Sequence, residues 1–239
     1  MTEMPPVCIL AGGLGTRLGA RAGGRPKAIV EVAGEPFAFH QLRQLAAAGV
    51  RHVVYCIGHL GEQIESCLGA ERFGLTIAYS RDSPDLDGTL GALRRARVQA
   101  GERFLYLYGD TYLRIDFAAA AAAWERSGRP ALMTVLRNEG AWGDSNAAFD
   151  GTLVTAYDKI RPVPSFSFID YGLGGLTASA LDAAPRDTRD LALLHTTLAA
   201  RGLLFGVEAH ERFYEIGSPA ALAETDAFLR ARGDAVTAR

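Results

Sequence analysis

The sequence predicts an α/β fold in which a mainly parallel sheet carries helices on both faces. Short apolar runs alternate with segments of helical periodicity through the first half of the chain, and the apolar runs have the length of buried strands. The composition of the 239 residues, 49% hydrophobic and 22% charged, is typical of a folded globular protein. Because no linker or internal repeat interrupts the chain, we expect a single domain over residues 1–239.

The first half contains five expected strands and four expected helices. The strands are predicted at 7–11, 52–58, 75–80, 103–110 and 131–136. The helices are predicted at 36–49, 61–69, 88–101 and 116–127. Alternation of this kind is typical of βαβ crossovers, which cover both faces of a parallel sheet with helices.

The pattern changes after residue 140. Residues 146–159 predict a hairpin that turns at Asp150–Gly151, and 165–176 predict a further strand. A helix at 189–202, a strand at 203–209 and a last helix at 218–233 follow. Ser218 is the expected N-cap of that last helix, with Pro219 at its first position.

Charge and composition exclude several classes of protein. A net charge of −2 argues against a general nucleic-acid binder, which normally carries a basic excess. No uncharged apolar run is long enough to span a membrane, and the N-terminus lacks the pattern of a signal peptide. The three cysteines, Cys8, Cys56 and Cys67, form no CxxC pair, which favours free thiols in a reducing compartment. We therefore expect a cytoplasmic protein without nucleic-acid or membrane partners.

A glycine-rich stretch, LAGGLGTRLGARAGGRPK, follows the first expected strand. Glycine content alone leaves two interpretations equally open: a slack surface loop, or a backbone that wraps a phosphate chain. The dinucleotide fingerprint is excluded because Leu18 stands where its third glycine would be, and the P-loop is excluded because Arg25 and Pro26 follow Gly24. Asp110 follows the fourth expected strand, and ligands bind at the carboxyl ends of the strands in such sheets.

The order of the motifs resembles one enzyme family. GGLGTRL followed by RPK, then YGDTY, YDK, IDYGLGGL and FYEIGSP, are similar in order to the motifs of sugar-1-phosphate nucleotidyltransferases, from residue 7 to about 230. Within that family the compact length is most similar to heptose- or mannose-1-phosphate guanylyltransferases and muramate-1-phosphate uridylyltransferases. The resemblance implies a Rossmann-like, GT-A-like fold of nucleotide-diphospho-sugar transferases. Its nucleotide-binding half would span about 1–137 and its sugar-phosphate half about 138–239.

The resemblance also implies the reaction. A sugar 1-phosphate attacks the α-phosphorus of a nucleoside triphosphate, and a nucleotide-sugar and pyrophosphate form with Mg²⁺ as cofactor. Both substrates are anionic, so such an enzyme mainly positions them and neutralises charge. GTP is favoured because the stretch Gly88–Leu93 is similar to the corresponding segment of guanylyl- and uridylyltransferases. A heptose- or mannose-like sugar is favoured by the resemblance to the guanylyltransferases of these sugars. A homodimer is expected because members of the fold often pair.

Roles are implied residue by residue. Arg17 would grip the β- and γ-phosphates, Lys27 would contact the α-phosphate and the attacking phosphate, and Asp110 would bind Mg²⁺. The other residues expected to contact the nucleotide are Leu10, Ala11, Gly12, Gly13, Gly15, Thr16, Gly88 and Thr89. Those expected to contact the sugar phosphate are Asn146, Lys159, Asp170, Tyr171 and Gly172.

The sequence departs from the family pattern at two of these positions. Glu215, the expected second metal ligand, stands where the family usually has aspartate, and Asp170 stands where it usually has asparagine. The identity of the sugar therefore stays open. Two alternatives are a nucleotidyltransferase that uses UTP, CTP or dTTP with another sugar 1-phosphate, and a catalytically silent regulatory subunit that keeps the pocket. A glycosyltransferase is disfavoured because no D-x-D motif is present at Asp110.

Overall fold

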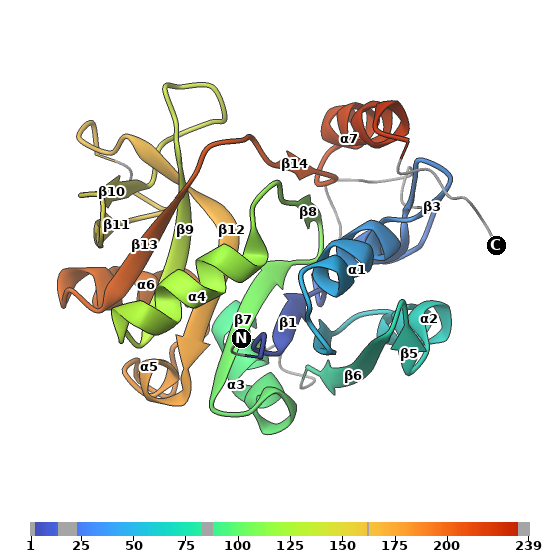
Figure 1. Ribbon diagram of the computed structural model, residues 1–239, viewed down its shortest axis with the longest axis horizontal. Coiled ribbons are helices and arrows are strands. Elements are labelled where there is room, and N and C mark those ends of the chain that lie inside the picture. The colour runs from blue at the N-terminus through green and yellow to red at the C-terminus, as the bar shows by residue number, and fades with distance from the viewer. Residues whose placement is uncertain (1–2, 14–22, 83–87, 162, 234–239) are drawn as a thin grey trace.

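The computed structural model describes residues 3–13, 23–82, 88–161 and 163–233, and a mixed sheet forms its centre (Figure 1). In these residues ten strands form one sheet, whose main path runs β11-β10-β12-β7-β1-β4-β6-β5. Its central parallel part consists of β1 (Val7–Leu10), β4 (His52–Ile57), β6 (Leu75–Arg81) and β7 (Arg103–Tyr108). A second parallel pair is formed by β9 (Ala131–Arg137) and β13 (Leu204–Ala209). The predicted α/β class with a single domain is confirmed.

Antiparallel strands extend the sheet beside β7. The long strand β12 (Phe168–Thr177) pairs with both β7 and β9 (Ala131–Arg137) in antiparallel fashion. The remaining strands of the sheet are β5 (Glu71–Arg72), β10 (Ala147–Phe149), β11 (Val154–Tyr157) and β13 (Leu204–Ala209). Hairpin β10–β11 is the one predicted from sequence, and the Asp150 carboxylate accepts from the backbone N–H of Leu153 at its turn.

Helices cover both faces of the sheet because successive strand residues point to opposite sides. Val7 and Ile9 belong to one hydrophobic cluster, and Cys8, between them, belongs to another. The first face carries α1 (Phe37–Ala47), α2 (Gly61–Leu68) and α4 (Phe117–Ser127). The second face carries α3 (Gly88–Ala100), α5 (Ala178–Leu181) and α6 (Leu191–Ala200).

A third, smaller cluster lies beyond the main sheet. It joins α7 (Pro219–Ala231) to the ribbons β2 (Glu31–Val32)–β3 (Glu35–Pro36) and β8 (Thr111–Tyr112)–β14 (Tyr214–Glu215). The 3-10 helix η2 (Lys27–Ile29) precedes β2. Ser218 caps α7 as predicted, since its hydroxyl accepts from the backbone N–H of Ala221 at 3.2 Å. In the described ranges no helix has the length and apolarity that a membrane span requires.

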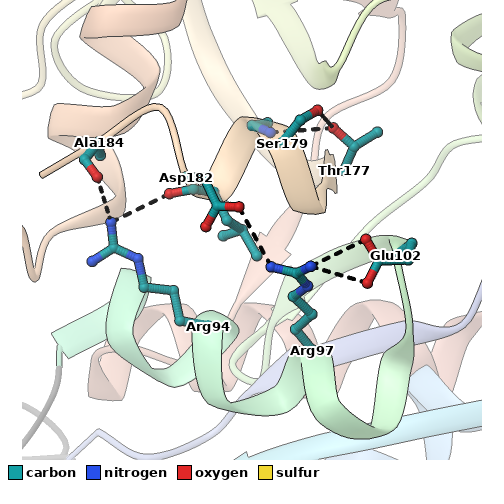
Figure 2. A network of polar contacts seen from close by, with 9 residues as sticks. Arg94, Arg97, Glu102, Thr177, Ser179, Asp182 and Ala184 are labelled. Atoms are coloured by element: carbon teal, nitrogen blue, oxygen red, sulfur yellow. Dashed lines mark hydrogen bonds and ion pairs between the residues drawn. The ribbon is translucent and has the colours of Figure 1, made fainter. Parts of the chain in front are cut away.

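Two arginines tie α3 to the segment that follows β12 (Figure 2). The Arg94 guanidinium donates to backbone carbonyls, among them that of Ala184 at 2.9 Å. Arg97 pairs with Glu102 at 3.0 Å and with Asp182 at 3.6 Å. Arg94 supplies most of these contacts, and Arg97 keeps its closer pairing with Glu102 whether or not Asp182 is charged.

Gly174 allows the close packing of a buried tyrosine. It lies opposite Tyr106 in the β7–β12 ladder, and a Cβ at this position would lie 2.1 Å from the Tyr106 hydroxyl oxygen. That hydroxyl lies 2.7 Å from Nε2 of the buried His195. Gly174→Ala is therefore expected to displace Tyr106 and to lower the free energy of unfolding by about 1–3 kcal/mol, as measured by urea denaturation. Gly13→Ala, where a Cβ meets nothing within 4 Å, is the control; equal losses in both variants would contradict this explanation.

Candidate active site

A cavity of about 330 Å³ opens at the carboxyl ends of β1, β4 and β7. The chain leaves β1 through α1 toward β4, whereas β7 lies on the other side of β1, so the strand order reverses here. Ligands of open α/β sheets bind at this switch point. The strand register places Cys56, Leu10 and Tyr108 side by side, and all three line the cavity.

The described residues that were predicted to bind the nucleotide converge on this cavity. Its lining includes six of them: Leu10, Ala11, Gly12, Gly13, Gly88 and Thr89. They come from two segments far apart in the sequence, the end of β1 and the beginning of α3. The other three predicted residues of the glycine loop, Gly15, Thr16 and Arg17, lie outside the described residues.

The beginning of α3 has a backbone that requires glycine. Gly88 has φ +67°, and a Cβ there would lie 2.5 Å from the carbonyl oxygen of Arg189. The next residue, Thr89, accepts the backbone N–H of Leu191 at 3.0 Å through its hydroxyl oxygen. The beginning of α3 is thus packed directly against the beginning of α6, and Gly88 and Thr89 line the cavity.

Lys27 and Asp110 form an ion pair at the cavity wall. Lys27 Nζ lies 3.1 Å from Asp110 Oδ2, and the two side chains are 16% and 29% exposed. Pro26 begins the 3-10 helix that carries Lys27, and Asp110 lies in the turn between β7 and β8. Eighty-three residues separate the pair in sequence, so the fold alone brings together the two charges predicted to act on the phosphates.

Glu215 lies on β14, the strand next to the turn that contains Asp110. In the β14–β8 ribbon Glu215 is opposite Thr111, and Ile216 donates its N–H to the carbonyl of Asp110 at 2.9 Å. Asp110 lines the cavity, whereas Glu215 is exposed and is not among the residues that line it. Mg²⁺ takes one or two protein carboxylates and completes its shell with substrate phosphates and water, so the Asp110 carboxylate fits such an ion. No group of three or more metal-binding side chains occurs among the described residues.

Four cavity residues were not among the predicted site residues: Cys56, Ala92, Asp82 and Tyr108, of which the last two carry polar groups. Asp82 follows β6, and its carboxylate fills space that Gly12 and Gly58 leave open: a Cβ at Gly12 would lie 2.6 Å from Asp82 Oδ2. Tyr108 is the last residue of β7. Both follow or end a strand at its carboxyl edge, the rule that had selected Asp110, so the same signal was available for them.

The residues predicted to bind the sugar phosphate gather around Asp170. Asn146 accepts the backbone N–H of Asp170 through Oδ1 at 2.8 Å, and Gly172 donates its N–H to Asp170 Oδ1 at 3.0 Å. Gly172 has φ +106°, and the β12–β9 register shifts between Asp170 and Gly174, as at a β-bulge. Lys159 is exposed, and its charge lowers the pKa of Asp170.

Tyr171 does not join that group, and its expected place in the sugar pocket is wrong. Its side chain is 1% exposed and belongs to the hydrophobic cluster under α1, α2 and α4. Its hydroxyl accepts the backbone N–H of Arg114 at 2.9 Å, and its ring packs edge-on against Phe213. Neighbouring strand residues point to opposite faces, so Tyr171 is turned away from the side chain of Asp170.

Burial changes the acidity of Asp170. Burial raises its pKa to about 6, although the N–H of Gly172, the charge of Lys159 and the hydroxyl of Tyr157 each act to lower the pKa. The folded protein therefore holds this proton more tightly than the unfolded chain does. The stabilisation that results is present below the unfolded pKa and is lost as the pH rises through about 6.

Asp170→Asn should remove this pH dependence. At pH 8 the variant is expected to exceed the wild type in free energy of unfolding by on the order of 2 kcal/mol, because asparagine carries no charge to desolvate. At pH 3.5 the difference should shrink toward zero. Denaturant titration at both pH values measures it, with the 73% exposed Asp182→Asn as the control. A pH-independent difference between Asp170→Asn and the wild type would contradict the account.

Comparison with known proteins places the chain in a family. Fold and cavity together define an α/β protein with a cavity at the carboxyl ends of its parallel strands and a Lys27–Asp110 ion pair at the cavity wall. Residues 7–211 match the MobA-like NTP transferase domain, and the chain belongs to that family. The motif resemblance to sugar-1-phosphate nucleotidyltransferases is confirmed by relatives of that kind, such as the glucose-1-phosphate cytidylyltransferase of Salmonella typhi, which is 26% identical over 87% of this chain and 88% of its own.

Two further relatives of this chain differ in how much of their own length it matches. The CMP-5'-(3-aminopropyl)phosphonate synthase of Streptomyces rubellomurinus is 35% identical over 66% of this chain, but the chain spans only 25% of the length of that relative. The structure of HddC from Yersinia pseudotuberculosis, complexed with GMP-PN, superimposes with a TM-score of 0.78 at 22% identity. The superposition covers 95% of this chain and 100% of the HddC chain, and it supports the GT-A-like fold.

Proposed function

We propose that the protein transfers a nucleotidyl group from a nucleoside triphosphate, with GTP favoured, to a sugar 1-phosphate, with a heptose- or mannose-like sugar favoured. One observation carries the proposal: the Lys27–Asp110 pair lies at the wall of the cavity that the six predicted nucleotide residues line. Family membership and the names of the relatives support it.

In this reaction an oxygen of the sugar phosphate attacks the α-phosphorus in line. The new P–O bond forms as the bond from the α-phosphorus to the bridging oxygen of the β-phosphate breaks, and pyrophosphate leaves with that electron pair. The Lys27 ammonium, held beside Asp110, is placed to neutralise charge that both reacting phosphates bring. Mg²⁺ held by Asp110 and Glu215 would add positive charge at the same phosphates when bound.

The preference for GTP rests on the base end of the cavity. Asp82 offers a carboxylate, which only accepts hydrogen bonds, near the glycines of the β1 loop. Guanine carries two neighbouring donors on one edge, whereas uracil and thymine carry a single donor between two carbonyl oxygens. The solved relative in complex with GMP-PN is in keeping with guanine, and the cytidylyl relatives make CTP the main competitor.

A catalytically silent subunit is the weaker alternative. A protein that only binds nucleotides has no need for a lysine and an aspartate paired at the phosphate end, yet Lys27 and Asp110 are both present and within 3.1 Å. The expected homodimer and the cytoplasmic location stay predictions; light scattering on the purified protein tests the first.

The test is pyrophosphate release with Mg²⁺, each of five nucleoside triphosphates and a panel of sugar 1-phosphates. We expect the highest kcat/KM with GTP. Release with CTP or dTTP alone would contradict the choice of guanine, and silence with every pair would contradict the enzyme.

A further inference from the structure

The Asp170 carboxylate is fixed in the half of the site that receives the acceptor. Its Oδ1 accepts the N–H of Gly172 at 3.0 Å, its Oδ2 lies 3.5 Å from the hydroxyl of Tyr157, and its own N–H is bonded to Asn146. With both ends of the residue held, the carboxylate cannot swing far to find a partner. Any group that it binds has to come to it.

This carboxylate is close to the nucleotide cavity. A Cβ built at Gly172 would lie 3.7 Å from Cδ2 of Tyr108, the ring that lines the cavity beside Leu10. The Asp170 and Tyr108 side chains therefore belong to neighbouring parts of one site. An acceptor whose phosphate lies at the Lys27–Asp110 pair can extend along Tyr108 toward Asp170.

The surroundings of Asp170 are rich in negative charge and aromatic rings. Burial and the charges of Asp170 and Asp190 raise the pKa of Tyr157, whose hydroxyl lies 3.5 Å from Asp170 Oδ2. Carboxylates together with the faces of tyrosine rings attract cations.

Positive charge at Asp170 is scarce in the described part of the chain. Lys159 is the one basic side chain whose charge lowers the pKa of Asp170, and it is exposed. The motif resemblance predicts that the ammonium of Lys159 binds the sugar phosphate. A buried carboxylate is costly unless an opposite charge pairs with it, and a neutral hydroxyl supplies a hydrogen bond but no charge.

We propose that the acceptor carries a protonated primary amine a few bonds from its phosphate, and that this ammonium binds the Asp170 carboxylate between the rings of Tyr108 and Tyr157. The inference rests on the proposed function, because it names the acceptor of that same site. Two kinds of compound share this chemistry: an amino sugar 1-phosphate, and an aminoalkyl phosphate or phosphonate. Both would use the same phosphate end and the same carboxylate.

The experiment compares acceptors that differ only in the amine. Glucosamine 1-phosphate is paired with glucose 1-phosphate, and 3-aminopropylphosphonate with propylphosphonate. Initial rates of pyrophosphate release, with Mg²⁺ and each nucleoside triphosphate at saturation, give kcat/KM for all four acceptors. We expect the amine to be preferred by about tenfold or more in at least one pair, since hydrogen bonds to charged groups are the stronger ones. The pair with the larger kcat/KM identifies the kind of acceptor.

The variant Asp170→Asn tests whether the charge of Asp170 causes the preference for the amine. Asparagine has the same shape and still accepts a hydrogen bond from a hydroxyl, so only the pairing of charges is lost. The preference for the amine should fall to about twofold or less, through KM more than kcat, whereas Asp182→Asn, which removes a remote, exposed carboxylate (Figure 2), should keep it. Equilibrium binding of glucosamine 1-phosphate should weaken in Asp170→Asn without a change in nucleotide binding. Thermal unfolding confirms that both variants are folded.

The possible outcomes separate the inference about the acceptor amine from the proposed nucleotidyl transfer. Turnover of glucose 1-phosphate or propylphosphonate as fast as their amines, or a preference that survives in Asp170→Asn, overturns this inference and leaves the proposed function standing. Absence of pyrophosphate with every acceptor, including the sugar 1-phosphates of the panel above, overturns both.

Discussion

Asp110→Asn is expected to lower kcat about 100-fold or more, the size of loss that follows removal of a group that stabilises charge in the transition state. The substitution preserves the shape of the side chain, and the bond from Ile216 N–H to the carbonyl of residue 110 stays in place. What is lost is the charge that pairs with Lys27 and that would hold Mg²⁺ with Glu215. Initial rates of pyrophosphate release at saturating substrates measure the effect.

The control for this variant is Asp182→Asn, which makes the same chemical change at a 73% exposed residue that follows the C-terminal end of α5. It should keep wild-type kcat. Both variants should unfold cooperatively near the wild-type temperature. An Asp110→Asn protein that is folded and close to fully active would show that this carboxylate takes no part in the reaction.

Lys27→Met is expected to lower kcat by a similar factor, about 100-fold or more. Methionine keeps most of the apolar stem of the 16% exposed side chain, so the variant isolates the ammonium. Without it, Asp110 loses its partner at 3.1 Å, and in the proposed reaction the phosphates would lose the positive charge of Lys27. Pyrophosphate release at saturating substrates again gives kcat.

Lys27→Arg provides the second comparison. A guanidinium keeps the charge but is longer and planar, and it cannot replace a compact ammonium at a crowded site. We expect it to recover only part of the lost rate. Full activity in Lys27→Met would contradict the role of the charge, and full activity in Lys27→Arg would contradict the requirement for its compact shape.

Local patterns in the sequence were enough to predict most of the fold. The parallel strands β1, β4, β6 and β7 are apolar runs separated by amphipathic helices, and each overlaps the range expected from sequence, β6 extending one residue beyond it. The last helix was predicted together with its cap because Ser218 and Pro219 carry a local signal. Several boundaries differ by a few residues; the one that bears on the site is that of the fourth strand, which ends at Tyr108 and is followed by the Asp110 turn.

Long-range pairings could not be predicted in the same way. The β8–β14 ribbon joins two-residue strands about a hundred positions apart, and neither strand has a periodicity of its own. Its existence depends on the packing of α7 against Tyr112 and Ile216. Motif resemblance placed Glu215 near Asp110 without showing the ribbon that brings them together.

Predicted residues that come from backbone motifs lie together in the structure, whereas the direction of a side chain was harder to predict. Leu10 to Gly13, Gly88 and Thr89 line one cavity because their motifs lie at strand ends and a helix start. Tyr171 was misplaced because a motif carried over residue by residue ignores the alternation along β12, which turns Tyr171 away from Asp170. Asp82 and Tyr108 were missed although strand ends had already been recognised as the place for ligands.

The most direct test of the central claim follows the α-phosphorus. The enzyme is incubated with Mg²⁺, a sugar 1-phosphate and GTP labelled at the α-phosphate, and products are counted over time. Nucleotidyl transfer predicts one labelled nucleotide-sugar for each pyrophosphate released, with both absent when the acceptor is left out. Label found only in GDP or GMP, or inorganic phosphate in place of pyrophosphate, would contradict nucleotidyl transfer at the Lys27–Asp110 site.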